Sequence, residues 1–386
     1  MKKLVMVGIT ILFIFTTSCI GKNSSKSSNS TSNDENSGNG IISVSVILKA
    51  FNQQRKVDGK LVPDVEAIVK AMQSLNSSVI KELTQDNANP IDDFSYDLTK
   101  DGKGVSIRNC RNSKNIPVVI VPETIEGITV TEIKNEAFWI TDLVAIILPE
   151  TITKIGTGGN SYSHSTFPSS LLIINFPLAL KEIGPSAFAF TNLITAHLPE
   201  GLQILGENAF THCNNLNSVT LPSSLKEIGD GVFSHSSNLA SAYLSEGLSK
   251  LGRDIFYSCR NLSVLILPSS LRVITSMAFS RTGIIELVIP EGVEIIDQYA
   301  FSECTRLRSV KIPSTIKEIR SSNSDFQDGG AFEGCSNLTD IIISDSLKSI
   351  AFKSGNRPAK TIFKGCGKLK LAVRQQLIEL GYNGDF

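Results

Sequence analysis

The chain has 386 residues, of which 41% are hydrophobic, and it carries 37 basic and 37 acidic side chains. The apolar content is sufficient for a folded core. A formal net charge of zero gives no strongly basic face, so we expect no nucleic-acid partner.

The first residues have the features of an export signal. Two lysines precede an apolar run over 4–15, which is too short to span a bilayer but has the length of a signal-peptide core. The run is followed by TTSC, which resembles a bacterial lipobox with Thr16 where leucine is usual. We therefore expect residues 1–18 to be a signal peptide and Cys19 to be acylated, because several acyl chains on one residue anchor a protein stably. The alternative is an ordinary secretory signal followed by an incidental cysteine.

Residues 19–40 are predicted to form a flexible tether. Almost all of them are serine, asparagine, glycine or charged residues, which cannot bury enough surface to fold. A random coil of this length has a root-mean-square span of about 25 Å. Such a tether would hold a domain away from a membrane.

A helical segment is expected over residues 41–92. Within 63–84 apolar residues recur at helical spacing, and Asp64 and Glu66 at the start suit the helix dipole. Residues 44–51 are compatible with either a short helix or a strand. The segment either packs on the end of the following domain or forms an independent module with its own partner.

From residue 94 the pattern changes to strands. Residues 94–107 alternate around Asp101-Gly102, which predicts a hairpin, and 118–121 are a continuous apolar strand. The following block, PETIEGITVTEI, is six residues longer than its later counterparts. Terminal repeats are usually atypical, because they cap an open end.

A phenylalanine then recurs at a nearly constant interval. Most spacings are 21 to 23 residues and three are 29 or 31, for phenylalanines at positions 138, 167, 188, 210, 233, 256, 279, 301, 332 and 363. A unit of this size cannot bury its own apolar face, so the units must stack into a solenoid. The phenylalanines are predicted to form one internal column.

The three long spacings have a common origin. Extra residues at 156–166, 320–331 and 351–362 follow the last apolar position of a coil and precede the next phenylalanine. We expect three loops along one edge, and repeat insertions often lie on the binding face. Their candidate contact residues are Tyr162, Phe326, Phe352 and Arg357.

The repeated phrase L-x-x-V-x-L-P-x-S-L-x-x-I-G-x-x-A-F-x-x-C resembles the BspA-type, or treponemal, leucine-rich repeat of bacterial surface lipoproteins. The resemblance extends over about 94–367 and includes the opening hairpin and the closing phrase CGKLKLAVRQQLIELGY. It implies an α/β repeat fold, a leucine-rich-repeat solenoid of stacked short parallel strands over 93–367. A C-terminal capping helix is expected within 368–386. It also implies surface exposure and binding of host or neighbouring-cell proteins, and some relatives are adhesins for matrix proteins.

The outward side chains of the strands are the first candidate for such binding. In SVTL, Val219 and Leu221 share the inward face, whereas Ser218 and Thr220 point outward. The same outward positions in later coils hold mostly apolar residues: Tyr243, Val264, Ile266 and Val288, followed by Lys311. Contiguous exposed apolar surface often marks a contact site, here with Tyr243 as anchor. Alternatively, residues 41–92 or an insertion loop cover this surface, or it reflects β-propensity alone.

Five cysteines lie three residues after a repeat phenylalanine, at positions 213, 259, 304, 335 and 366. Other coils carry serine or threonine in this register, which could not freely replace a disulfide partner, and paired histidine ligands for a metal are absent. We therefore favour buried free thiols beneath the turn. A disulfide between Cys304, Cys335 or Cys366 stays open, because their coils are consecutive.

No residue pattern indicates catalysis. The chain lacks a phosphate loop, a G-x-S-x-G elbow and H-E-x-x-H, and its four histidines are scattered. We expect no enzymatic activity, no cofactor and no metal. The predicted function is that of a monomeric, membrane-anchored surface lipoprotein that binds an extracellular or cell-surface protein, such as host matrix. The alternatives are a periplasmic structural or assembly lipoprotein and a carbohydrate-binding module.

Overall fold

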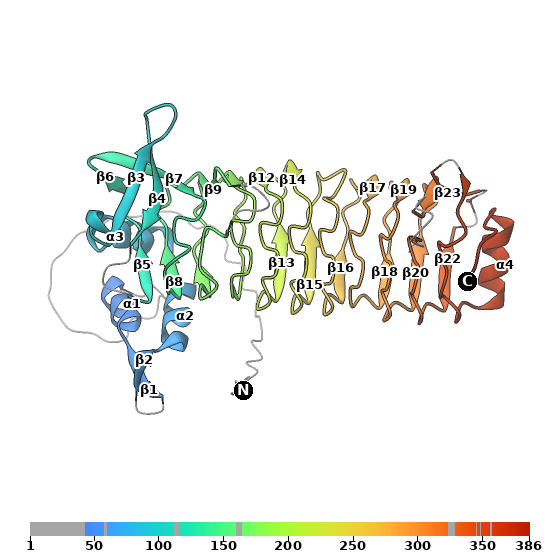
Figure 1. The fold of residues 1–386 in the computed structure, drawn as a ribbon, viewed down its shortest axis with the longest axis horizontal. Coiled ribbons are helices and arrows are strands. Elements are labelled where there is room, and N and C mark those ends of the chain that lie inside the picture. Colours follow the sequence, from blue (N-terminus) through green and yellow to red (C-terminus); the bar gives the residue numbers. More distant parts are fainter. Residues whose placement is uncertain are drawn as a thin grey trace, which may run out of the picture. The chain divides into compact units, whose positions relative to one another are not determined.

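The structure, a computed structural model, describes residues 43–57, 60–111, 116–159, 164–322, 329–344, 346–347, 349–355 and 357–386. All of them belong to one compact unit. The unit is a stack of coils with a group of helices near its N-terminal end and one helix at its C-terminal end (Figure 1). The expectations for Cys19, the signal peptide and the tether lie outside the described residues.

One side of each coil is a short strand, and most of these strands pair in parallel along the stack. They are β5 (Val118–Ile120), β8 (Ala145–Ile147), β10 (Ile173–Ile174), β13 (Ser218–Leu221), β15 (Ser241–Leu244), β16 (Val264–Ile266), β18 (Glu286–Val288), β20 (Ser309–Ile312) and β22 (Asp340–Ile343). The register keeps equivalent positions side by side, as in Thr220 opposite Tyr243 and Tyr243 opposite Ile266. We call the outward surface of this column the strand face.

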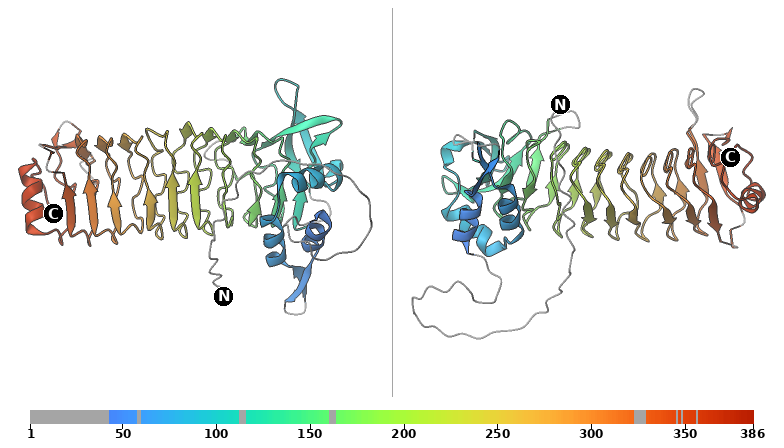
Figure 2. Two further views of the ribbon diagram at one scale, coloured as in Figure 1. Left: turned by 180° about the vertical axis from the view of Figure 1, so that it is seen from behind. Right: turned by 90° about the horizontal axis from the view of Figure 1, so that it is seen from below.

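A second column of short strands forms another side of the coils, and Figure 2 shows the two columns from behind and from below. It contains β7 (Ile128–Lys134), β9 (Lys154–Thr157), β11 (Glu182–Ile183), β12 (Ile204–Leu205), β14 (Glu227–Ile228), β17 (Val273–Ile274), β19 (Ile295–Ile296), β21 (Glu318–Arg320) and β23 (Ala351–Ser354). At the N-terminal end this column continues into the antiparallel hairpin β3 (Phe94–Leu98) and β4 (Val105–Cys110), as predicted. At the C-terminal end β23 pairs antiparallel with β24 (Arg357–Pro358).

The third side consists of the turns that carry the repeat phenylalanines, which we call the Phe turns. They form a ladder of their own, because the N–H groups of Asn208, Phe210 and His212 donate to carbonyls of the next coil at 2.8–2.9 Å. Asn208 and His212 have φ of 56° and 57°, in the left-handed region. Such backbone is uncommon outside glycine. Its recurrence two residues before and after many of the phenylalanines shows that the ladder requires it.

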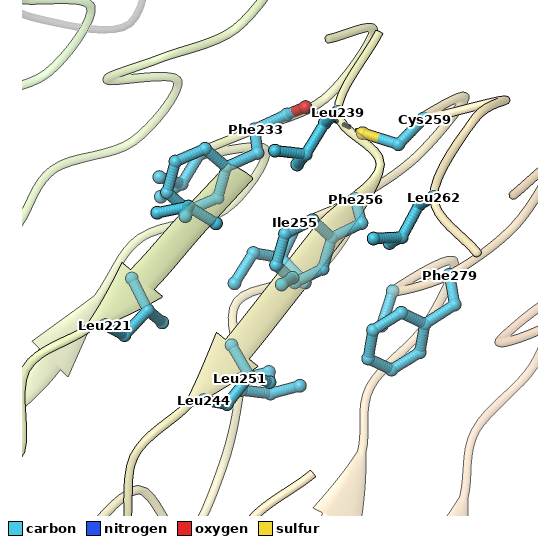
Figure 3. Close-up of a cluster of buried hydrophobic side chains, with 14 of the residues drawn as sticks. Leu221, Phe233, Leu239, Leu244, Leu251, Ile255, Phe256, Cys259, Leu262 and Phe279 are labelled. Carbon is cyan, nitrogen blue, oxygen red and sulfur yellow. Dashed lines mark hydrogen bonds between the residues drawn. The ribbon is translucent and has the colours of Figure 1, made fainter. Parts of the chain in front are cut away.

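The phenylalanines form the predicted internal column. Their rings are fully buried and stack from Phe138 to Phe363 with neighbouring centroids 4.8–5.7 Å apart. Figure 3 shows Phe233, Phe256 and Phe279 in line, with leucines of the strands and turns and Ile255 around them. The predicted solenoid of stacked short parallel strands is confirmed.

The six-residue enlargement in the first coil forms a small hairpin. Strand β6 (Thr124–Ile125) pairs antiparallel with the start of β7, and Glu126 and Gly127 connect them with φ of 52° and 77°. Positive φ at both central residues is the requirement of a type I′ turn, which matches the twist of the strands. The extra residues therefore leave the register of the core unchanged.

The N-terminal segment contains α1 (Val44–Phe51), α2 (Val65–Gln73), α3 (Ser77–Asp86) and a short hairpin of β1 (Gln54–Val57) and β2 (Lys60–Pro63). Asp64 caps α2 by accepting from the N–H of Ala67 at 3.3 Å. Asn76 caps α3 by accepting from the N–H of Val79 at 3.0 Å, so the helical pattern over 63–84 divides into two helices. A 3-10 turn, η1 (Ile91–Asp93), then leads into the first coil.

The C-terminal helix α4 (Leu371–Glu379) covers the last coil. Val373 and Leu377 are buried against the core. After the helix, the hydroxyl of Tyr382 lies 2.9 Å from the carbonyl oxygen of Lys360 and 2.6 Å from that of Asp385, and it donates its one hydrogen between them. The ring of Tyr382 lies edge-on to Phe363 at 5.1 Å. The phenylalanine column thus ends in an aromatic cluster that closes the core.

Candidate binding surface

The strand face divides into a covered and a bare part. Helices α1, α2 and α3 pack over β5, β8 and β10, and their apolar residues form one cluster with the outward side chains of these strands. The buried strand residues are Val118, Ile120, Ala145, Ile147 and Ile173, none of which is more than 5% exposed. The helical segment therefore packs on the N-terminal coils, one of the two arrangements that the sequence left open.

Asn89 bonds to the backbone of β5 at the edge of the covered part. The Oδ1 atom of Asn89 accepts from the N–H of Ile120 at 2.9 Å, and the N–H of Asn89 donates to the Ile120 carbonyl at 2.9 Å. Strand β5 therefore does not present free backbone groups at this residue, where an open edge would invite pairing with another chain.

The bare part lies over β15, β16 and β18, where the predicted surface residues are exposed. The exposed fractions are 40% for Tyr243, 46% for Val264, 54% for Ile266 and 66% for Val288. We call these four residues the bare patch. Tyr243 is opposite Ile266 in the register, and Val288 is opposite Lys311, which is also exposed. The helical segment does not reach the patch, so that alternative does not apply here.

Polar residues separate the covered part from the bare patch. Asn175 lies beside the covered strands, and its side chain amide accepts from the N–H of Leu148 and donates to the Leu148 carbonyl, both at 2.8 Å. The next outward residues along the column, His197 and Thr220, are exposed. The bare patch is thus bounded by polar groups on this side and by Lys311 on the other.

Of the four candidate loop residues, only Phe352 has a described side chain. Tyr162 and Phe326 lie outside the described residues, and for Arg357 the structure gives the backbone of β24 alone. Phe352 is only 7% exposed, lies in β23 and packs edge-on against Phe363 and Tyr382. The expectation that it is a loop contact is wrong, because Phe352 pairs with Ile319 and is the last apolar position of its coil in place of Ile350.

The register cysteines satisfy the backbone beneath the Phe turns. The Sγ–H of Cys213 donates to the Phe188 carbonyl at 3.1 Å, and Cys259 donates to Phe233 at 3.0 Å (Figure 3). Ser236 makes the same bond to the Phe210 carbonyl. Burial raises the pKa of Cys213 to about 12, so its thiol keeps the proton that it donates.

The described cysteines of this register, Cys213, Cys259, Cys304, Cys335 and Cys366, are all buried and free. Where threonine occupies this position, the turn is one residue shorter than in the cysteine coils. Thr191 and Thr282 each donate to the carbonyl of the repeat phenylalanine in their own coil at 2.8 Å. The position three residues after each repeat phenylalanine therefore requires a small hydrogen-bond donor. This requirement explains why cysteine, serine and threonine replace one another there.

Within the described ranges, no group of three or more His, Cys, Asp or Glu residues is arranged to hold a metal ion. The same residues include no helix long and apolar enough to cross a membrane.

A family model described as "BspA type Leucine rich repeat region" matches the chain in six copies, over residues 107–167, 160–285 and 273–379. No curated protein matches the chain.

Several solved structures are similar to the chain. A leucine-rich repeat protein from Bacteroides ovatus is 25% identical, with 77% of this chain and 98% of that chain covered and a TM-score of 0.46. The leucine-rich repeat protein of T. pallidum is 24% identical, covers 78% of this chain and 98% of its own, and has a TM-score of 0.32. The pneumococcal vaccine antigen PcpA is 21% identical over 76% of this chain and 82% of its own, with a TM-score of 0.38.

Proposed function

Because the chain belongs to the BspA-type leucine-rich repeat family, whose solenoids typically act as protein-interaction scaffolds, we propose that it is a surface-exposed lipoprotein that binds a host or neighbouring-cell protein. The observation that carries the proposal is the bare patch. A parallel sheet is normally covered on both faces, and the outward side of β15, β16 and β18 is not.

The chemistry of the patch fits a protein partner. Tyr243 offers a ring and a hydroxyl, and Val264, Ile266 and Val288 offer branched apolar surface, which is the composition of an interface centre. Thr220 and Lys311 supply a polar rim on either side. Partner contact would bury apolar area that is in water in this structure, at roughly 25 cal/mol per Å².

The binding proposal is tested by removing the apolar groups from the patch. The variant Tyr243→Ser/Ile266→Ser in the mature full-length chain should lose capture of extracellular-matrix and cell-surface proteins by at least tenfold, measured by surface plasmon resonance. The matched control Ile140→Ser/Leu178→Ser removes two exposed apolar side chains that lie outside the strand face. A double variant that stays folded and binds as well as the control would refute the role of the patch.

The anchor and the location are tested in the cells that produce the protein. Cys19→Ala should abolish incorporation of labelled palmitate and release the protein from the membrane fraction. Protease added to intact cells should degrade the anchored protein if it faces outward. Full protection, with digestion only after the outer envelope is opened, would favour the periplasmic alternative.

A further inference from the structure

A shallow hollow of about 380 Å³ lies where the chain leaves the Phe turns toward the strand face, and none of its lining residues belongs to the bare patch. Residues of three successive coils line it: Arg260, Arg281, Thr282, Glu303, Thr305 and Arg306. Three of these six side chains are arginines, although the chain as a whole has no net charge.

The hollow arises from a shortened coil. Cys259 and Leu262 are separated by two residues, as are the corresponding Cys304 and Leu307, whereas only Gly283 lies between Thr282 and Ile284 in the coil between them. Gly283 also lacks a side chain, and a Cβ there would lie 2.3 Å from the carbonyl oxygen of Arg260. The middle coil is therefore recessed between its two neighbours.

The arginines around the hollow have no carboxylate partner. In the described part of the chain, neither Arg260, Arg281 nor Arg306 forms an ion pair, although Glu303 lines the same hollow. By contrast, Arg320 pairs with Glu318 at 3.1 Å and with Asp297 at 3.8 Å. Three arginines and one glutamate line the hollow, and an anionic ligand would offset this excess of positive charge.

One of the three guanidinium groups is held in place by an aromatic ring. The Nη1 atom of Arg281 donates to the hydroxyl of Tyr257 at 3.0 Å, and its Cζ atom lies 5.7 Å from the centre of the Tyr257 ring. The ring of Tyr257 in turn lies edge-on to His235 at 5.1 Å. A pre-positioned guanidinium loses less conformational entropy when it binds a ligand.

We propose that this hollow binds the sulfate esters of a sulfated glycan. The fork of donors on a guanidinium matches the oxygens of a tetrahedral oxyanion, and the hydroxyl of Thr305 adds a further donor. The arginines come from three coils and are spread over about 10 Å of the stack, which suits a linear polyanion better than a single ion. The choice of a glycan rests on the proposed location outside the cell, and the site itself does not depend on the bare patch.

The test measures binding of a heparin-derived hexasaccharide to the full chain by isothermal titration calorimetry, beside its desulfated counterpart and inorganic sulfate. We expect the sulfated hexasaccharide to bind, its affinity to fall with added NaCl, and the other two probes to bind at least tenfold more weakly. Equal binding of the desulfated hexasaccharide would overturn the proposal. Equal affinity for inorganic sulfate would assign the hollow to a free anion and would also overturn it.

Substitutions locate the binding. The affinity for the hexasaccharide should fall by roughly tenfold in each of the variants Arg260→Ser, Arg281→Ser and Arg306→Ser, because each loses a charge-assisted hydrogen bond. Arg253→Ser is the matched control, because Arg253 is exposed and lies on the other end of its Phe turn. Unchanged binding by the triple variant, with an unchanged melting temperature, would sink the proposal.

A change of opposite sign gives an independent test. Glu303→Gln removes the one carboxylate that lines the hollow and should tighten hexasaccharide binding several-fold. Glu379→Gln on α4 makes the same change in net charge far from the hollow and should have no effect. An equal gain in both variants would show attraction by net charge alone and would contradict a defined site.

Histidine 235 reports occupancy of the hollow without mutation. Its pKa is lowered by burial and then by the charges of Arg260 and Arg281, while Asp254 acts in the opposite direction. A bound anion would offset the two arginines and raise this pKa, which proton NMR would show as a shifted His235 titration. A His235 titration that is the same with and without the hexasaccharide would argue against the site.

The separate tests keep the two functions distinguishable. Tyr243→Ser/Ile266→Ser should bind the hexasaccharide normally, whereas the triple arginine variant should still capture the protein partner. Loss of glycan binding in the patch variant would mean that one surface serves both ligands, and the proposal of a separate site would then fail.

Discussion

The two parts of the strand face use the same residue types in opposite ways. Ile147 in β8 and Ile266 in β16 occupy equivalent outward positions, yet the first is fully buried and the second is 54% exposed. The difference comes from elsewhere in the chain, since α1, α2 and α3 supply enough apolar surface to cover β5, β8 and β10 and no more. An outward apolar residue in a solenoid strand therefore predicts that something covers that face. The cover can be a segment of the same chain or another molecule.

A charged residue placed on each part should give the largest difference. Ile147→Asp would bury a carboxylate beneath the helices and should destabilise the protein by about 4 kcal/mol or more. Ile266→Asp places the same group in water and should change stability by at most about 0.5 kcal/mol, while it abolishes partner binding. Urea unfolding followed by circular dichroism measures both. Similar losses in the two variants would mean that the bare patch is covered in solution.

A smaller effect is expected from neighbouring residues on α1. Ile47 is fully buried against the covered strands and Val46 is 54% exposed. Ile47→Ala should cost about 2–4 kcal/mol because it leaves a cavity, whereas Val46→Ala should be nearly neutral. Hydrogen exchange at β5 and β8 should increase in the first variant and not in the second. Unchanged protection in both would show that the helices do not stabilise these coils.

The smallest effect is a pH dependence of the coils around the bare patch. The rings of His212 and His235 stack at 4.5 Å, and burial lowers the pKa of both below the usual 6.5, with further contributions from Arg260 and Arg281 at His235. The unfolded chain then binds protons more readily, so stability is full above about pH 6.5 and falls as the pH drops.

Hydrogen exchange of the Phe210 and Phe233 amides, corrected for the intrinsic rate, should therefore be faster at pH 5.5 than at pH 7.5. His235→Asn should reduce this difference, and His197→Asn should leave it as it is. Identical protection of these amides at both pH values would contradict the coupling.

The architecture followed from the sequence because its signals are repeated. Each repeat phenylalanine reports the same buried position, so chance resemblance at one coil does not mislead. Cysteine, serine and threonine in one register indicate a shared role as donors to the carbonyl of a repeat phenylalanine. The location of the bare patch followed from the period of the strands in the same way.

Sequence reasoning missed features that the repeated pattern does not encode. Two residues inserted before Phe352 moved it from the predicted loop into β23, and Asn76 ended a helix that the apolar spacing alone would have continued. The arginine-lined hollow had a signal, the single residue between Thr282 and Ile284, but its meaning depends on three arginines that only the stacking brings together.

The backbone hydrogen bonds between neighbouring Phe turns run in one direction, because the N–H groups of each coil donate to the next coil, whereas the cysteine thiols donate to the coil before. Each interior coil therefore bonds to a neighbour on both sides and can be exchanged for another, whereas each end coil has a neighbour on one side only. Removal of the 23 residues from 234 to 256 would offer Cys259 the carbonyl of Phe210 in place of that of Phe233, with every later register intact. The length of the solenoid can therefore be changed by adding or removing whole coils. Helices α1 to α3 and α4 would continue to cover the same two ends.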